Sequence, residues 1–213
     1  MQADELNTQS SYDRVAKAYA DKYLREFEEK PFDRERLDRF ASRVKGKGRA
    51  CDLGCGPGQA AAYLQARGVD AFGIDLSPGM VEQARQAHPG IEFQQGDMRA
   101  LPLPEESLAG IAAFYSIIHI PRQDVITVLR EFKRVLQPGG VVLLAFHLGD
   151  EERHVEEMLG QPVSLDATFF QTAEMESYLR EAGFTVEESL ERDPYPDVEY
   201  QGRRGYIVAS KEN

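Results

Sequence analysis

The middle of the chain alternates short apolar runs with amphipathic stretches. Between the apolar runs, hydrophobic residues recur at three- and four-residue steps, as they do in helices that cover a sheet. The apolar runs, of strand length, are residues 49–53, 71–75, 91–95, 108–118 and 141–146, and the helical stretches are residues 58–67, 78–87 and 121–136. This alternation predicts right-handed crossovers and an α/β fold, a doubly wound, mostly parallel sheet with helices on both faces.

The N-terminal part has a helical pattern of its own. Over residues 9–45, tyrosine and apolar residues recur at three- and four-residue steps, and Pro31 interrupts them. This pattern predicts two amphipathic helices that precede the first strand.

The last third of the chain is acidic and less periodic. Residues 147–170 predict irregular structure with at most a short helix over residues 150–159, and Thr172 is the expected cap of the helix that follows. Residues 184–191 and 204–211 predict two strands. A loop without a helix joins them, so antiparallel pairing is the simplest arrangement.

Composition and charge exclude several classes of protein for this chain. The chain has 213 residues, 42% of them hydrophobic, enough for one large domain with a substantial core. Its formal net charge is -11, and a surface of that sign repels phosphate backbones, so no nucleic-acid partner is expected. No apolar run approaches the ~20 residues that cross a bilayer. The N-terminus has no signal-peptide pattern, so we expect a cytoplasmic protein without a membrane partner.

The two cysteines, Cys51 and Cys55, exclude two further classes. Two thiols cannot form the framework of a disulfide-rich secreted domain. No histidine lies near them in the sequence, so they do not indicate a zinc site, and we predict no metal.

The strongest candidate for chemistry is the glycine-rich stretch after the first predicted strand. Asp52 ends that strand, and Gly54, Gly56 and Gly58 follow at every second position. Glycines let the backbone adopt positive φ and approach a ligand closely. Because a helix follows at once, its free N–H groups face the same place, at the carboxyl end of a parallel strand.

Two classes of cofactor fit such a turn. Residues 56–61 match the dinucleotide pattern G-x-G-x-x-A, which indicates a nicotinamide-dependent oxidoreductase. A pyrophosphate, however, favours bare amides with no anion beside it. Asp52 instead suits a cofactor that carries positive charge, such as the ammonium and sulfonium of S-adenosylmethionine (SAM).

The order of motifs resembles the class I SAM-dependent methyltransferases along nearly the whole chain, and is most similar to ubiquinone-biosynthesis-like and related small-molecule enzymes. The motifs are Cys51-Asp52-Leu53-Gly54-Cys55-Gly56-Pro57-Gly58, Gly73-Ile74-Asp75-Leu76-Ser77, Gly96-Asp97-Met98 and the segment of residues 129–140 before the fifth strand. The resemblance implies a Rossmann-like sheet of seven strands with the last one antiparallel. It also implies one domain over residues 1–213. Its parts are an N-terminal helical lid (1–45), a SAM-binding core (49–146), and a variable cap segment with the C-terminal strands (147–213).

The same resemblance assigns the cofactor-binding residues. Asp75 would accept hydrogen bonds from both ribose hydroxyls, since a carboxylate has two acceptor oxygens. Asp97 would accept from the adenine amino group. Leu76 and Met80 would flank the adenine, and Met98 would donate its amide to a ring nitrogen. The remaining predicted cofactor contacts are Asp52, Gly54, Gly56, Tyr115 and two tyrosines of the Tyr-Asp-x-x-Ala-x-x-Tyr segment, Tyr12 and Tyr19.

Two histidines are candidate catalytic residues. His119 follows the fourth strand, where the methyl group would lie in this family, and an imidazole titrates in the range needed to assist an O–H or N–H acceptor. His147 ends the fifth strand at the same edge of the sheet. Packing at a strand end is the alternative for His119. Weaker candidates for lining the pocket, for which a solvated loop is the favoured alternative, are Asp166, Phe169, Phe170, Tyr195, Glu199 and Arg203.

The predicted activity is methyl transfer from SAM to an O or N atom of a small molecule. No Asn/Asp-Pro-Pro-Tyr/Phe motif follows the fourth strand, where residues 114–117 read Phe-Tyr-Ser-Ile, and this weakens a base-amino methyltransferase. Two alternatives stay open, namely the oxidoreductase and a SAM-binding module without catalysis. The sequence does not decide between a monomer and a homodimer.

Overall fold

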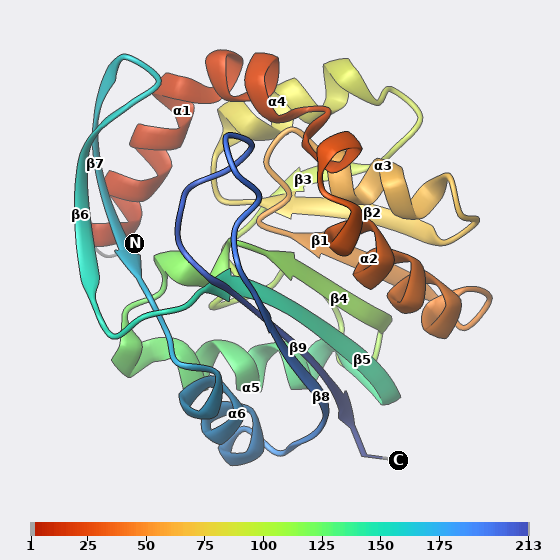
Figure 1. Cartoon of the computed structure of the whole chain (residues 1–213). Coiled ribbons are helices and arrows are strands. Elements are labelled where there is room, and N and C mark those ends of the chain that lie inside the picture. The colour runs from red at the N-terminus through yellow and green to blue at the C-terminus, as the bar shows by residue number, and fades with distance from the viewer. Residues whose placement is uncertain (1–2, 213) are drawn as a thin grey trace.

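The computed structural model describes residues 3–212 and is built around a seven-stranded sheet with the order β3-β2-β1-β4-β5-β9-β8 (Figure 1). The first five strands along the chain pair in parallel, and β9 runs antiparallel to both of its neighbours. The seven-stranded fold with an antiparallel last strand is therefore confirmed. The strands are β1 (Arg49–Leu53), β2 (Asp70–Asp75), β3 (Phe93–Gln95), β4 (Leu108–Phe114), β5 (Leu136–His147), β8 (Phe184–Arg192) and β9 (Arg204–Lys211).

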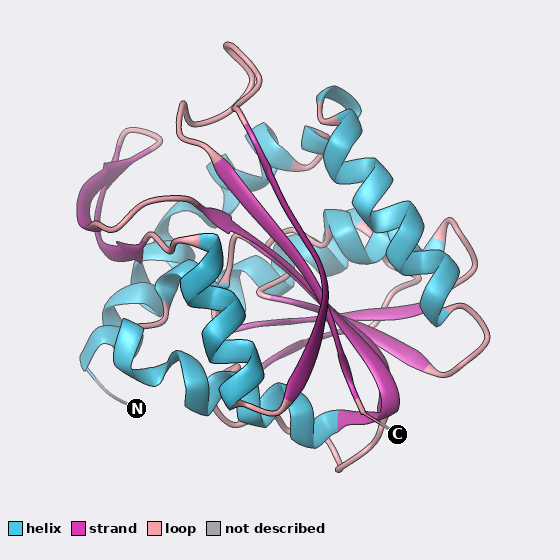
Figure 2. Cartoon of the chain, turned by 60° about the horizontal axis from the view of Figure 1, so that its bottom comes forward, coloured by secondary structure: helices cyan, strands magenta, loops and turns pink. Residues whose placement is uncertain are grey.

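Helices cover both faces of this sheet (Figure 2). Along β1, Ala50 points to the face covered by α2 (Pro31–Val44) and α3 (Gln59–Gln65), and α4 (Pro78–Ala87) packs beside α3. The next residue, Cys51, points to the opposite face, which is covered by α5 (Val125–Val135) and α6 (Thr172–Glu181). Because successive side chains alternate between two covered faces, a parallel strand is apolar throughout, as its sequence predicted.

The first helix, α1 (Ala3–Tyr23), packs on α4 and on the later strand β7. Asp13 connects α1 to α4, since its Oδ1 accepts hydrogen bonds from the Ser77 hydroxyl at 2.6 Å and the Gly79 amide at 2.8 Å. Ser77 in turn accepts the Met80 amide as the N-cap of α4. A short 3-10 helix, η1 (Glu26–Glu29), leads from α1 to α2.

The prediction for residues 147–170 is wrong. Two strands, β6 (Glu152–Met158) and β7 (Gln161–Thr168), form an antiparallel hairpin outside the main sheet. The turn is Leu159-Gly160, both at positive φ, as two-residue hairpin loops require. Val163 and Leu165 are buried against α1 while their neighbours are more exposed. This period-two pattern in β7 was the missed signal.

Other element boundaries differ by a few residues. The helix predicted from residue 121 begins at Val125, after a 3-10 turn, η3 (Arg122–Asp124). Thr172 does not cap α6: it is the first helical residue, Gln171 holds the N-cap position, and the Thr172 hydroxyl donates to Glu191 instead. Within the described residues, no helix is long and apolar enough to cross a membrane.

Candidate active site

The glycine turn follows β1, and each of two glycines has a separate structural reason. Gly54 has φ 71°, and a Cβ there would lie 2.2 Å from the Cβ of Ser116. Gly56 has φ 52°, and its Cβ would meet only the Tyr19 ring, at 3.8 Å. Gly54 thus permits close packing of two chain segments, whereas Gly56 leaves its backbone open toward a cavity.

Asp75, at the end of β2, is held beside this turn. Its two carboxylate oxygens accept the Gly56 amide at 2.8 Å and the Ser77 amide at 2.9 Å. Burial raises the pKa of Asp75 to about 6, although these amides favour the ionised form. A carboxylate oxygen can accept more than one hydrogen bond, so Asp75 keeps capacity for a ligand.

Asp52 is a second buried carboxylate at the turn. Its Oδ2 accepts the Ala61 amide, in the first turns of α3, at 2.9 Å. Burial raises the pKa of Asp52 to about 7, and the negative charge of Asp75 adds to the shift. Asp52 therefore carries only part of a charge at neutral pH.

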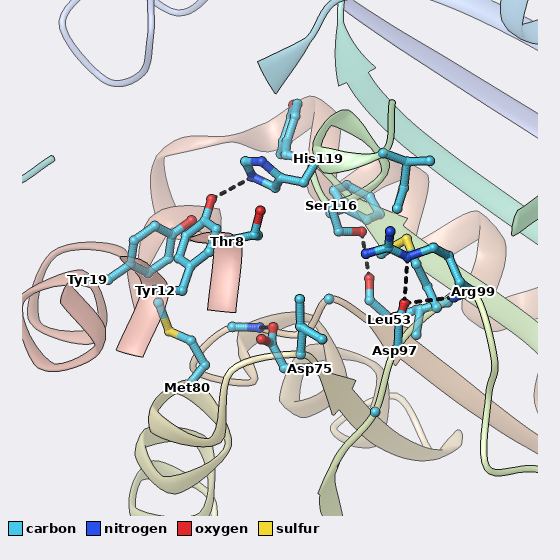
Figure 3. A pocket seen from close by; sticks show the side chains of 18 of the residues that line it. Thr8, Tyr12, Tyr19, Leu53, Asp75, Met80, Asp97, Arg99, Ser116 and His119 are labelled. Carbon is cyan, nitrogen blue, oxygen red and sulfur yellow. Dashed lines mark hydrogen bonds and ion pairs between the residues drawn. The ribbon is translucent and has the colours of Figure 1, made fainter. Parts of the chain in front are cut away.

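A cavity opens at the carboxyl ends of β1, β2 and β4 (Figure 3). Asp97 lies on its wall, where its Oδ1 accepts the Arg99 amide at 2.9 Å and Arg99 Nε at 3.2 Å. The structure brings together at this cavity nearly all of the predicted cofactor residues, namely Tyr12, Tyr19, Gly54, Gly56, Asp75, Leu76, Met80, Asp97, Met98 and Tyr115, together with His119. Asp52 does not line this cavity but lines a second one beside it.

Tyr12 and His119 form a pair at the border of the two cavities. The Tyr12 hydroxyl lies 2.7 Å from Nε2 of His119, and Nδ1 of His119 lies 2.9 Å from the main-chain oxygen of Asp166 in β7. A carbonyl oxygen only accepts, so Nδ1 carries the proton and Nε2 accepts from Tyr12. Burial lowers the pKa of His119, which favours the neutral ring.

The second cavity is partly open to solvent and shares Tyr12, Tyr115 and His119 with the first. His147 lies in it, stacked between Tyr115 and Phe169 with ring centroids 5.3 and 5.2 Å away. Burial lowers the pKa of His147 to about 3, and nearby Arg204 contributes. His147 is therefore neutral at pH 7 and would be a poor base.

Sequence reasoning missed several residues of the second cavity. They come from η1, α3, the start of α2, the hairpin, the loop after β8 and the start of β9, and are Glu26, Gln59, Lys30, Arg153, Tyr200 and Arg204. Of the weaker candidates, Phe169 and Glu199 line this cavity, whereas its lining does not include Asp166, Phe170, Tyr195 or Arg203. One signal was available, since Arg204 is a charged residue directly before the apolar run of residues 205–209. Within the described residues, no group of three or more metal-ligating side chains occurs.

Comparisons with known proteins agree with this geometry. Residues 50–140 match the model of a methyltransferase domain. A malonyl-[acyl-carrier protein] O-methyltransferase from Serratia marcescens is 32% identical over 51% of this chain and 47% of its own length. A fatty-acid O-methyltransferase from Mycolicibacterium smegmatis is 38% identical over 47% of this chain and 37% of its own length. The chain thus spans about half or less of the curated relatives it matches.

Among solved structures, a SAM-dependent methyltransferase from Methanosarcina mazei superimposes with a TM-score of 0.72 at 16% identity. The superposition covers 80% of this chain and 95% of that one, and at this identity it supports the fold. The matching domain model and the named relatives do not favour the nicotinamide-dependent alternative. Over residues 50–140 the chain is similar to a methyltransferase domain, and its fold matches that of a SAM-dependent methyltransferase of known structure.

Proposed function

We propose that this protein binds SAM in the first cavity and transfers its methyl group to an O or N atom of a small molecule in the second. The observation that carries the proposal is the adjacency of the two cavities. Tyr12, Tyr115 and His119 line both, so a donor in one and an acceptor in the other would meet at these side chains.

The first cavity has groups that fit each part of SAM. The Asp75 carboxylate, already oriented by two amides, would accept hydrogen bonds from the ribose hydroxyls. Leu76 and Met80 would contact the adenine, and Asp97 would accept from its amino group. From the adjoining cavity, Asp52 would favour the ammonium, and a bound cation would in turn lower the raised pKa of this carboxyl. Two carboxylates beside the glycine turn would repel a pyrophosphate.

When bound, SAM would supply a methyl group already activated by its sulfonium. The protein then has to align the acceptor and exclude water. The hairpin β6–β7 suits the second task, since Val163 and Leu165 pack on α1 and Asp166 holds His119. In this proposal, α1 and the hairpin together form the lid over the site.

His119 is the proposed base for an acceptor that carries a proton. With Nδ1–H bonded to the Asp166 carbonyl, the Nε2 lone pair faces the Tyr12 hydroxyl. An acceptor O–H that replaces or joins Tyr12 would give its proton to Nε2, while Nδ1–H keeps its bond to the carbonyl. Since several of the curated relatives are named O-methyltransferases, we favour oxygen as the methylated atom.

The test is label transfer from methyl-labelled SAM to a panel of phenols, carboxylic acids and amines. We expect label in a small-molecule product, at a rate reduced roughly 100-fold by His119→Gln and less by Tyr12→Phe. His154→Gln is the matched control, because this exposed histidine pairs with Asp166 on the outside of the hairpin. Tight SAM binding without label transfer across the panel would favour a SAM-binding module instead.

A further inference from the structure

The second cavity contains a buried arginine with unused hydrogen-bonding capacity. Arg204 is only 2% exposed, at the start of β9. Its Nη1 and Nη2 donate to the main-chain oxygens of Gly202 and Tyr200, the latter at 2.7 Å. Its Nε, among the described residues, is buried without a hydrogen-bond partner. A buried donor without a hydrogen-bond partner costs free energy, so we expect this N–H group to donate to an acceptor atom of a ligand.

The charge of Arg204 is also only partly neutralised. The carboxylate beside it is Glu199, whose Oε2 lies 3.5 Å from Nη2. Glu199 already accepts from Arg192 and lies 3.6 Å from Nζ of Lys30, so three cations surround it. Arg192 and Lys30 each have a second carboxylate, Asp33 and Glu26 respectively, at 2.8 and 2.5 Å. Arg204 therefore has the weakest ionic partner of the three.

His147 provides a second unpaired nitrogen at the same place. It pairs with Arg204 in the β5–β9 register, and cross-strand partners point to the same side of a sheet. In the part of the chain that the structure describes, Nδ1 of His147 is buried without a hydrogen-bond partner. The ring is fixed by stacking between Tyr115 and Phe169, so its nitrogens have a defined direction.

The rest of this cavity is largely apolar and aromatic. Ile118, Val155, Met158, Leu165 and Ala167 line it together with the rings of Tyr23, Phe27, Phe169 and Tyr200. Such walls suit an apolar or aromatic body. Charged side chains also line the cavity, but Glu26, Lys30, Arg153 and Glu199 are each already in an ion pair. Arg204 and His147 contribute buried unpaired nitrogens.

We propose that Arg204 and His147 bind a carboxylate of the methyl acceptor as a handle, while a separate O–H or N–H group of the acceptor reaches Tyr12 and His119. The acceptor is then an aromatic or apolar acid with a second nucleophilic group. This inference rests on the proposed function. The carboxylate is the handle and not the methylated group, because an oxyanion bonded to a guanidinium is a poorer nucleophile.

The test compares 4-hydroxyphenylacetate with its neutral isostere 4-hydroxyphenylacetamide. Binding of both probes is measured by calorimetry, with and without saturating S-adenosylhomocysteine. We expect the acid to bind at least ten-fold more tightly than the amide. Arg204→Gln should abolish this preference, and His147→Phe, which keeps the stacked ring, should reduce it. Arg180→Gln, at an exposed ion pair on α6, should leave it unchanged.

Three results would overturn the proposal. The first is that the wild-type protein binds the acid and the amide with equal affinity, or binds neither probe. Another is a preference for the acid that persists in both Arg204→Gln and His147→Phe, with thermal melts showing that the variants are folded. The third is an alkali-labile methyl ester as the product, which would make the carboxylate the nucleophile. Failure to bind S-adenosylhomocysteine would instead refute the proposed function. The acid and amide affinities measured without S-adenosylhomocysteine would still test the carboxylate site.

Discussion

Replacing Asp75 by asparagine should weaken cofactor binding strongly. The carboxylate is buried, and both of its oxygens face backbone N–H donors, from Gly56 at 2.8 Å and Ser77 at 2.9 Å. Asparagine must turn its NH2 group toward one of these donors or toward a ribose hydroxyl. A hydrogen bond to a charged group contributes about 1.5–3 kcal/mol, so losing one lowers affinity about ten- to 150-fold.

The assay is calorimetric titration with S-adenosylhomocysteine at pH 7.5, above the pKa of about 6 that burial gives Asp75. Asp70→Asn is the matched control, because Asp70 begins the same strand with its side chain 71% exposed. The control should bind as the wild type does. Unchanged affinity of a folded Asp75→Asn variant would refute the ribose assignment.

Three further substitutions test the site through stability. Burial raises the pKa of Asp52 to about 7, so ionisation of this carboxyl destabilises the folded state progressively above pH 4. In urea unfolding, the stability of Asp52→Asn relative to the wild type should therefore rise from pH 5 to pH 8. A stability difference that does not change with pH would contradict this. Asp13→Ala removes two hydrogen bonds to the start of α4 and should lower the free energy of unfolding by about 1–2 kcal/mol. Asp21→Ala, at an exposed residue of the same helix, should leave it unchanged. Gly54→Ala should lower the melting temperature sharply or prevent folding, whereas Gly90→Ala, with open space around it, should not.

The helix and strand limits of the core could be predicted where a local signal coincides with burial. The helix Pro78–Ala87 is found as predicted, since Ser77 is its N-cap and Pro78 its first residue. Strand β2 ends at Asp75 as expected, because the apolar run ends at this acid. In these places the sequence pattern and the three-dimensional environment agree.

Strand β6 and the second cavity could not be predicted with the same reasoning. Most of β6 is charged and exposed, so its pairing is visible only through its contacts with β7 and α1. Lys30 and Arg204 lie far apart in the sequence and meet around Glu199 only when α2 and β9 are placed by the fold. The local periodicity of the sequence does not indicate such contacts between distant residues.

The most direct test of the account is calorimetric titration of the protein with SAM, S-adenosylhomocysteine and NADH. We predict micromolar binding of SAM and S-adenosylhomocysteine and no heat of binding for NADH. The glycine turn with Asp52 and Asp75 beside it is the physical basis of this prediction. Binding of NADH without binding of SAM would contradict the cofactor assignment and the proposed methyl transfer with it.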